Sequence, residues 1–195
     1  MILIFGYGSL VNRKTWDFQA EYFKCSIIEW KRHWGQAIQV GQRLVSALTV
    51  HPQHTANLRG ILIKTDAETC KMIDIREMGY KRVSLPSDCV KLQNRMDESQ
   101  IVNGSIYTYT SDHIKPHRIR KKPVILQSYI DVVADGFYNE FGERGFWEFF
   151  EDTLGWELQI LNDRNRPLYP RAVDIPKTLL KMIDHAIMMK KDNNL

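Results

Sequence analysis

The sequence predicts an α+β fold. Strand-like runs of apolar and β-branched residues are concentrated in the first 110 residues, whereas segments with helical spacing lie mostly after residue 125. Regular βαβ repeats would alternate these two patterns along the chain, which this sequence does not do. With 195 residues, 44% of them hydrophobic, the chain is long enough to bury a sizeable core, and we expect one domain over residues 1–195.

The expected strands are short runs separated by turn residues. The first is the apolar opening of the chain, and a short helix or loop is expected after it, from Asn12 to Phe23. The run from Ser105 to Thr110 alternates in the manner of a half-buried strand. The full set of expected strands covers residues 1–5, 25–30, 36–41, 45–50, 58–64, 80–85, 89–93 and 105–110.

A helix is expected from about Asp66 to Glu77. Thr65 and Glu68 have the spacing of a capping box, and Asp66 adds negative charge at the same helix start. Gly79 is placed to end the helix. Apolar spacing predicts later helices over residues 126–137 and 145–154, and a C-terminal helix over residues 176–189 in a segment that begins at about residue 174.

Composition favours a cytoplasmic protein with a small-molecule partner. The net charge of +4 is too mild to indicate nucleic acid or membrane binding, and a basic run at residues 115–122 has no nucleic-acid-binding signature beside it. Cys25, Cys70 and Cys89 are widely spaced and odd in number, which favours free thiols in a reducing compartment. We expect no signal peptide, because no charged region precedes the short apolar opening, and no apolar run is long enough to span a bilayer.

The histidines do not form a recognisable metal site. His51 and His54 lie close in sequence, as do His113 and His117, but neither pair has a third ligand at a telling spacing. We therefore expect no metal. The sequence leaves the oligomeric state open.

The opening of the chain carries the most informative motif. An apolar run leads directly into Gly6-Tyr7-Gly8-Ser9-Leu10, where the glycines allow a sharp turn and a close approach of the backbone to a ligand. Such a loop offers amide N–H groups to an anion. The alternative is a glycine turn that only ends a core strand. A dinucleotide-binding fingerprint is disfavoured, because it requires a small residue where this chain has Val11.

Glu77 is the candidate general base. It shares a helix stripe with Cys70 and Ile73, so it is expected to face the interior. Burial and the negative end of the helix dipole both raise the pKa of a carboxyl group. The alternative is a structural ion pair with a nearby basic residue at position 76, 81 or 82.

These motifs together resemble the gamma-glutamylcyclotransferase-like superfamily. The resemblance rests on the opening Phe5–Leu10 hexapeptide, which is most similar to the ChaC-like branch, and on Arg76-Glu77 followed by Gly79-Tyr80. It extends in order to a tyrosine-bearing strand around Tyr107 and to later helices. It implies a mixed, curved or barrel-like β-sheet with helices packed around it.

The resemblance also implies a reaction. Members cyclise a gamma-glutamyl group by intramolecular attack of its α-amine, which releases 5-oxoproline and the amine, and they need no metal, nucleotide or other cofactor. Glu77 would act as base and then acid, while Tyr7, Gly8, Ser9 and Leu10 would hold the glutamyl end. The alternative is a non-catalytic module on the same fold that binds a small ligand or a protein.

Two further features are candidates for the cavity wall. Tyr80, Tyr107 or Tyr109 can each project a hydroxyl toward the substrate, although aromatic packing is the expected role of at least one. The Asp163–Arg171 segment combines extended prolines with arginines that suit a carboxylate. This segment either covers one side of the cavity or is a surface loop whose arginines meet local acids.

Overall fold

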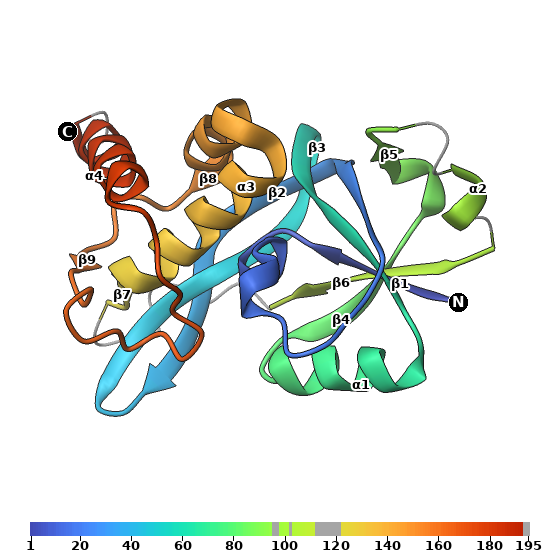
Figure 1. The fold of residues 1–195 in the computed structure, drawn as a ribbon, viewed down its shortest axis with the longest axis horizontal. Helices are drawn as coiled ribbons and strands as arrows, with labels where there is room; N and C mark the ends of the chain where they lie inside the picture. The colour runs from blue at the N-terminus through green and yellow to red at the C-terminus, as the bar shows by residue number, and fades with distance from the viewer. Residues whose placement is uncertain (95–97, 102, 112–121, 193–195) are drawn as a thin grey trace.

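The computed structural model describes residues 1–94, 98–101, 103–111 and 122–192 (Figure 1). Its strands are β1 (Ile2–Gly6), β2 (Tyr22–Val40), β3 (Arg43–Thr65), β4 (Lys81–Leu85), β5 (Val90–Leu92), β6 (Ser105–Thr110), β7 (Val124–Leu126), β8 (Thr153–Leu154) and β9 (Ile160–Leu161). Its α-helices are α1 (Ala67–Arg76), α2 (Glu98–Ile101), α3 (Gln127–Asp152) and α4 (Lys177–Asp192). Three short 3-10 turns cover Ser9–Val11, Arg13–Thr15 and Ser87–Cys89.

The strands form one mixed sheet, which confirms the predicted α+β class. Along its main path the order is β4-β6-β1-β3-β2-β5, with β1 parallel to β6 and antiparallel to β3. Two short strands attach to this path by parallel pairing, β8 to β2 and β7 to β3. Strand β9 in turn pairs parallel with β7. The path begins at β4 and ends at β5, so the sheet is open and does not close into a barrel.

A long hairpin of β2 and β3 connects the two ends of the molecule. In Figure 1 it runs from β1, β4, β6 and α1 on the right to α3 and α4 on the left. The sequence predicted four strands here, but they form two continuous ones. The breaks are absorbed by register shifts between Ile28 and Trp30 and between Trp34 and Gln36, with Glu29 at a φ of 64°. A bulge bends a strand without ending it.

The N-cap of helix α1 lies one residue later in the chain than the predicted cap, Thr65. The Asp66 carboxylate accepts a hydrogen bond from the Thr69 amide at 2.7 Å, so Asp66 and not Thr65 is the N-cap. The Thr65 hydroxyl instead donates to the Ile2 carbonyl at 3.0 Å, which ties the end of β3 to β1. The predicted capping box is therefore wrong, although the helix is confirmed. Gly79 follows it with a φ of 110°.

Helix α3 contains both of the helices predicted between residues 126 and 154. Gly142, at a φ of 67° and a ψ of −164°, interrupts the helical geometry at the expected gap. A residue without Cβ adopts this conformation at little cost. The buried face of α3 contributes Phe137, Phe149 and other aromatic side chains to a core that also contains Phe5 and Ile61 of the sheet.

Other expectations have mixed outcomes. The three cysteines are buried free thiols, as predicted. Among the described helices, none combines the length and apolar character needed to cross a bilayer. The pair His113 and His117, and residues 115–121 of the basic run, lie outside the described residues.

Candidate active site

The loop after β1 turns immediately into a 3-10 turn. The amides of Val11 and Asn12 donate to the carbonyls of Gly8 and Ser9, whereas in the described chain no loop or turn hydrogen bond is donated by the amides of Gly8, Ser9 or Leu10. Three backbone donors thus stay available at the loop. This is the arrangement expected of an anion-binding backbone segment.

Gly8 is required for close packing. Its φ is −123°, so the position does not need the left-handed conformation. A Cβ placed there would lie 3.2 Å from the Tyr129 hydroxyl and 3.6 Å from a Leu48 methyl group. The close neighbour of this glycine in the structure is a tyrosine of α3, and a close approach to a ligand stays a prediction.

A buried arginine holds the loop from behind. Arg32 of β2 is 1% exposed, and its guanidinium donates to the Tyr7 carbonyl at 2.8 Å, to the Thr153 hydroxyl at 2.8 Å and to the Phe149 carbonyl at 3.3 Å. The Tyr7 carbonyl and the Gly8 N–H belong to one planar peptide group and point in opposite directions. Fixing the carbonyl therefore also fixes the direction of the neighbouring donor.

Glu77 lies at the C-cap of α1, beside this loop. Its side chain is 17% exposed, and its carboxylate is 3.3 Å from the Arg76 Nε. Burial raises the pKa of Glu77, while the charges of Arg76 and Arg171 oppose that rise. The predicted direction of the shift is confirmed. The predicted alternative, an ion pair with a neighbouring arginine, is present as well, so Glu77 is both paired and directed toward the cavity.

Arg76 joins Glu77 to the loop. Its Nη2 donates to the Ser9 hydroxyl at 3.1 Å and to the Thr15 hydroxyl at 2.9 Å, and its Nη1 donates to the Thr15 carbonyl at 3.0 Å. The side chain is 3% exposed, and its Nε has no hydrogen-bond partner among the described residues. Arg76 therefore fixes the distance between the base candidate and the amide donors.

The loop, Glu77 and several tyrosines enclose a small inner pocket. It is lined by Phe5, Gly6, Tyr7, Gly8, Ser9, Leu10, Leu48, Glu77, Tyr80, Tyr109 and Tyr129. The Tyr7 hydroxyl donates to the Tyr109 carbonyl at 2.7 Å, and the Tyr80 hydroxyl donates to the Leu48 carbonyl at 2.8 Å. Burial raises the pKa of both phenols well above the ordinary value, so both stay neutral near neutral pH.

An outer cavity opens from the inner pocket. Both spaces are lined by Ser9, Glu77, Tyr80 and Tyr129. The remaining outer wall consists of Ile38, Val40, Val45, Ser46, Ala47, Arg76, Met78, Leu126, Leu168, Tyr169, Pro170 and Arg171. The hairpin of β2 and β3 and the C-terminal end of the Asp163–Arg171 segment thus face each other across it.

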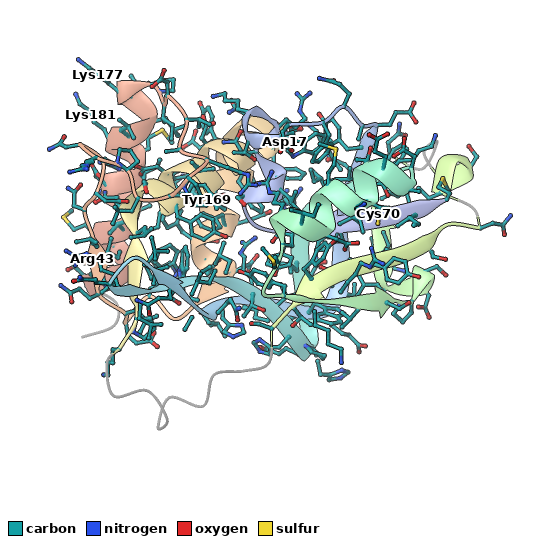
Figure 2. The ribbon with its side chains drawn as sticks, turned by 90° about the horizontal axis from the view of Figure 1, so that it is seen from below. Asp17, Arg43, Cys70, Tyr169, Lys177 and Lys181 are labelled. Atoms are coloured by element: carbon teal, nitrogen blue, oxygen red, sulfur yellow. The ribbon has the colours of Figure 1, made fainter. Side chains whose placement is uncertain are left out.

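The two ends of the Asp163–Arg171 segment behave differently. Arg164 donates to Asp131 at 2.7 and 2.8 Å and pairs with Asp184 at 2.7 Å, as expected of a structural arginine. Tyr169 packs its ring 4.8 Å from that of Tyr129, and Figure 2 shows it near the middle of the molecule. Each of the two predicted roles therefore applies to one part of this segment.

Tyr107 lies elsewhere. It is not part of either cavity wall, and its ring lies 5.1 Å from the Arg82 guanidinium. Tyr109, two residues later, reaches the inner pocket and donates its hydroxyl to Asp74 at 2.6 Å. Of the predicted site residues, the structure brings Tyr7, Gly8, Ser9, Leu10, Glu77 and Tyr80 together and leaves Tyr107 outside.

Sequence reasoning missed several residues of this site. Arg76 was recognised only as part of a motif and as an ion-pair candidate. Arg32, Ser46 and Tyr129 carry no local signal, since Arg32 and Ser46 are strand residues and Tyr129 comes from a helix far along the chain. No group of three or more potential metal ligands occurs within the residues that the structure describes.

Chemically, the inner pocket combines a carboxylate of raised pKa with uncommitted amide donors. Such a carboxylate is able to accept a proton from a bound cationic group near neutral pH. The amides are able to hold an oxyanion or a carboxylate beside it. The arrangement suits proton transfer next to a stabilised negative charge.

No protein-family model matches the sequence, and no curated protein matches it either. Solved structures do. A gamma-glutamyl cyclotransferase aligns with a TM-score of 0.56 at 12% identity, over 94% of this chain and 98% of that chain. An uncharacterised human protein aligns with a TM-score of 0.56 at 11% identity, over the same 94% and 98%. A yeast cyclotransferase specific to glutathione has a TM-score of 0.46 at 14% identity, over 97% of this chain and 96% of that chain. The first of these alignments, with a TM-score of 0.56, shows that the chain has the fold of a gamma-glutamyl cyclotransferase.

Proposed function

We propose that this protein is a gamma-glutamyl cyclotransferase, which converts a gamma-glutamyl amide into 5-oxoproline and a free amine. The observation that carries the proposal is the buried Glu77 carboxylate, whose pKa is raised, beside the uncommitted amides of Gly8, Ser9 and Leu10. A cyclisation needs a base next to a site that stabilises an oxyanion. Both lie in the inner pocket.

In the proposed reaction, the glutamyl half folds against the loop and Glu77 at the inner pocket. Glu77 removes a proton from the α-ammonium group, and the freed amine attacks the γ-carbonyl carbon. The carbonyl oxygen becomes negatively charged and accepts hydrogen bonds from the loop amides. Holding the two reacting groups close together supplies a large part of the acceleration, since both belong to one molecule.

Proton transfer completes the reaction. The bond from the γ-carbon to the departing nitrogen breaks as Glu77 passes its proton to that nitrogen. The attacking nitrogen gives its second proton to Glu77 as the lactam forms, and Glu77 passes this proton to the released amine, which leaves as an ammonium ion. Glu77 thus returns to its starting form without a net change in charge or protons.

The test is direct detection of product. Purified protein is incubated with a panel of gamma-glutamyl amino acids, glutathione and gamma-glutamyl amines, and 5-oxoproline is measured by mass spectrometry. We expect release from at least one compound, with loss of release in the Glu77→Gln variant. Binding of panel members without any turnover would contradict the proposal and favour a non-catalytic binding module.

We further propose that the protein works in the cytoplasm on small molecules. The three buried free cysteines support this, because a reducing compartment keeps such thiols unpaired. Fractionation of cells that express the tagged chain would test the location.

A further inference from the structure

We infer that the outer cavity selects the amine half of the substrate, and that it takes an amine half with an apolar side chain and a carboxylate. The inference rests on the proposed function for the orientation of the substrate. It adds two residues, Ser46 and Arg171, as determinants of specificity.

The first step is the continuity of the two spaces. Ser9, Glu77, Tyr80 and Tyr129 line both of them. A glutamyl group that is folded against the loop has its γ-carbonyl near Glu77, so the group attached to that carbonyl extends past Glu77. The outer cavity is the adjoining space that shares these four residues with the inner pocket.

The second step is the character of the wall. Val45 and Leu126 are 5% and 4% exposed, and Leu168 and Ile38 complete an apolar surface across the cavity. An apolar side chain bound there leaves water, which raises affinity about fourfold for each buried methylene group. A small amine half such as glycine leaves this surface uncovered.

The third step is the presence of unused polar groups. Ser46 is 2% exposed, and its hydroxyl has no hydrogen-bond partner among the described residues. A buried polar group without a partner is uncommon in folded proteins. Because Ser46 lines the outer cavity, rotation of its hydroxyl toward that space would let a bound ligand supply the missing partner.

Arg171 provides a charge of the opposite sign to a carboxylate. Its guanidinium is near enough to Glu77 to lower the pKa of that group, yet it forms no hydrogen bond or ion pair with another described side chain. Arg76, by contrast, is committed to Glu77, Ser9 and Thr15. Arg171 is therefore the cation available to a ligand.

The charge balance also disfavours some substrates. Two arginines and one carboxylate face the outer cavity, which gives it a net positive charge. An amine half that carries an additional ammonium group, such as a diamine, would be repelled. An amino acid or peptide with a free carboxylate would be attracted.

Matched substrates test the inference. Gamma-glutamyl-leucine and gamma-glutamyl-3-methylbutylamide differ only in the carboxylate of the amine half, and gamma-glutamylcadaverine carries a cation there. We expect kcat/KM for the leucine compound to exceed that for the carboxylate-free amide by about tenfold or more, the usual gain from a charge-assisted hydrogen bond. The cadaverine compound should be the poorest of the three.

Variants then assign the preference to its residues. Arg171→Gln should reduce the preference for the carboxylate to about twofold or less, and Ser46→Ala should reduce it partly. Arg166→Gln is the matched control, because Arg166 is an exposed arginine of the same segment that is not part of the cavity wall. If Arg171→Gln instead lowers kcat/KM equally for both compounds, Arg171 binds the glutamyl half and the inference is wrong.

Binding separates this inference from the proposed function. Dissociation constants are measured by calorimetry for the same compounds on the wild type and on Glu77→Gln. The expected preference without any 5-oxoproline release would overturn the reaction and leave the outer cavity as a recognition site. Turnover without a preference among the three compounds would overturn the inference and leave the reaction.

Discussion

The inner pocket and the outer cavity share a wall, yet their polar groups are satisfied in different ways. In the inner pocket, the hydroxyls of Tyr7 and Tyr80 are held by backbone carbonyls. In the outer cavity, the Ser46 hydroxyl has no partner among the described residues. A pocket whose side chains are already fixed suits a step common to all substrates, because it needs no rearrangement when the reaction occurs. A cavity with a side-chain hydroxyl that has no partner suits selection between substrates.

The supports of the two spaces also differ. The inner pocket is braced on one side by Arg76 and on the other by Arg32, which both hydrogen-bond to the loop or its neighbours. The outer cavity is bounded by Arg171 and the segment before it, and by the hairpin of β2 and β3. Substitutions in the inner pocket should therefore affect the binding and turnover of every substrate, and substitutions in the outer cavity should affect the choice of substrate.

The largest effect is expected for Glu77→Gln, because Glu77 lines both the inner pocket and the outer cavity. The variant keeps the size and hydrogen-bonding capacity of the side chain but loses its basicity. We expect kcat to fall about 100-fold or more, with little change in the melting temperature. Kinetics and thermal denaturation check this. Wild-type turnover would remove Glu77 as the base, and a large loss of stability with a proportionate loss of activity would identify a structural ion pair.

The next effect is expected for Arg32→Met. Methionine fills much of the space but leaves the buried Tyr7 and Phe149 carbonyls without their donor. We expect the free energy of unfolding to fall by about 1–3 kcal/mol and KM to rise, because the loop loses its rear support. Urea denaturation and steady-state kinetics measure the two. Arg32→Lys keeps the charge without the forked geometry, and an unchanged KM in both variants would show that the loop is held in other ways.

A smaller effect is expected for Gly8→Ala. The added methyl group would lie 3.2 Å from the Tyr129 hydroxyl, so one of the two must move slightly. We expect substrate binding to weaken by about 1 kcal/mol. The double variant with Tyr129→Phe removes the crowded oxygen and should restore part of the affinity. Normal binding by Gly8→Ala would mean that the loop does not contact the ligand closely.

The smallest effect is a pH dependence of stability. Because the pKa of Glu77 is raised in the folded protein, the folded state binds its proton more tightly than the unfolded state does. The contribution of Glu77 to stability is therefore greatest at low pH and declines as the pH rises from the ordinary glutamate pKa through the raised one. Denaturation of the wild type and Glu77→Gln across pH should show this difference. The opposite slope would mean that the Arg76 charge outweighs burial.

Local sequence patterns predicted the two parts of the site that each lie within a short stretch of the chain, the loop and Glu77. The loop at Tyr7–Leu10 follows directly from an apolar strand and two glycines, and Glu77 follows from the stripe of α1. The pairing of β1 with β3 then brings the two regions together. The open sheet and its parallel and antiparallel pairs have no signature of this kind, because register depends on contacts between distant strands.

The rest of the site could not be predicted, for the same reason. Arg32 and Ser46 are ordinary residues in their local surroundings, and their roles depend on neighbours many residues away. Tyr107 was a predicted site residue that shares one strand face with Tyr109, yet it packs against Arg82. Alternation along the sequence does not decide which of two tyrosines on one strand face reaches a cavity.

The β2–β3 hairpin has a consequence for how such a protein changes over evolutionary time. One part of it carries Arg32, which supports the loop, and its turn end carries Ile38, Val45 and Ser46, which line the cavity that we propose for the amine half. The antiparallel pairing of β2 with β3 between these two regions separates them and fixes their positions along the hairpin. Mutations near the turn can therefore shift substrate preference gradually without disturbing the reaction, so one scaffold is able to diversify among substrates while its chemistry is conserved.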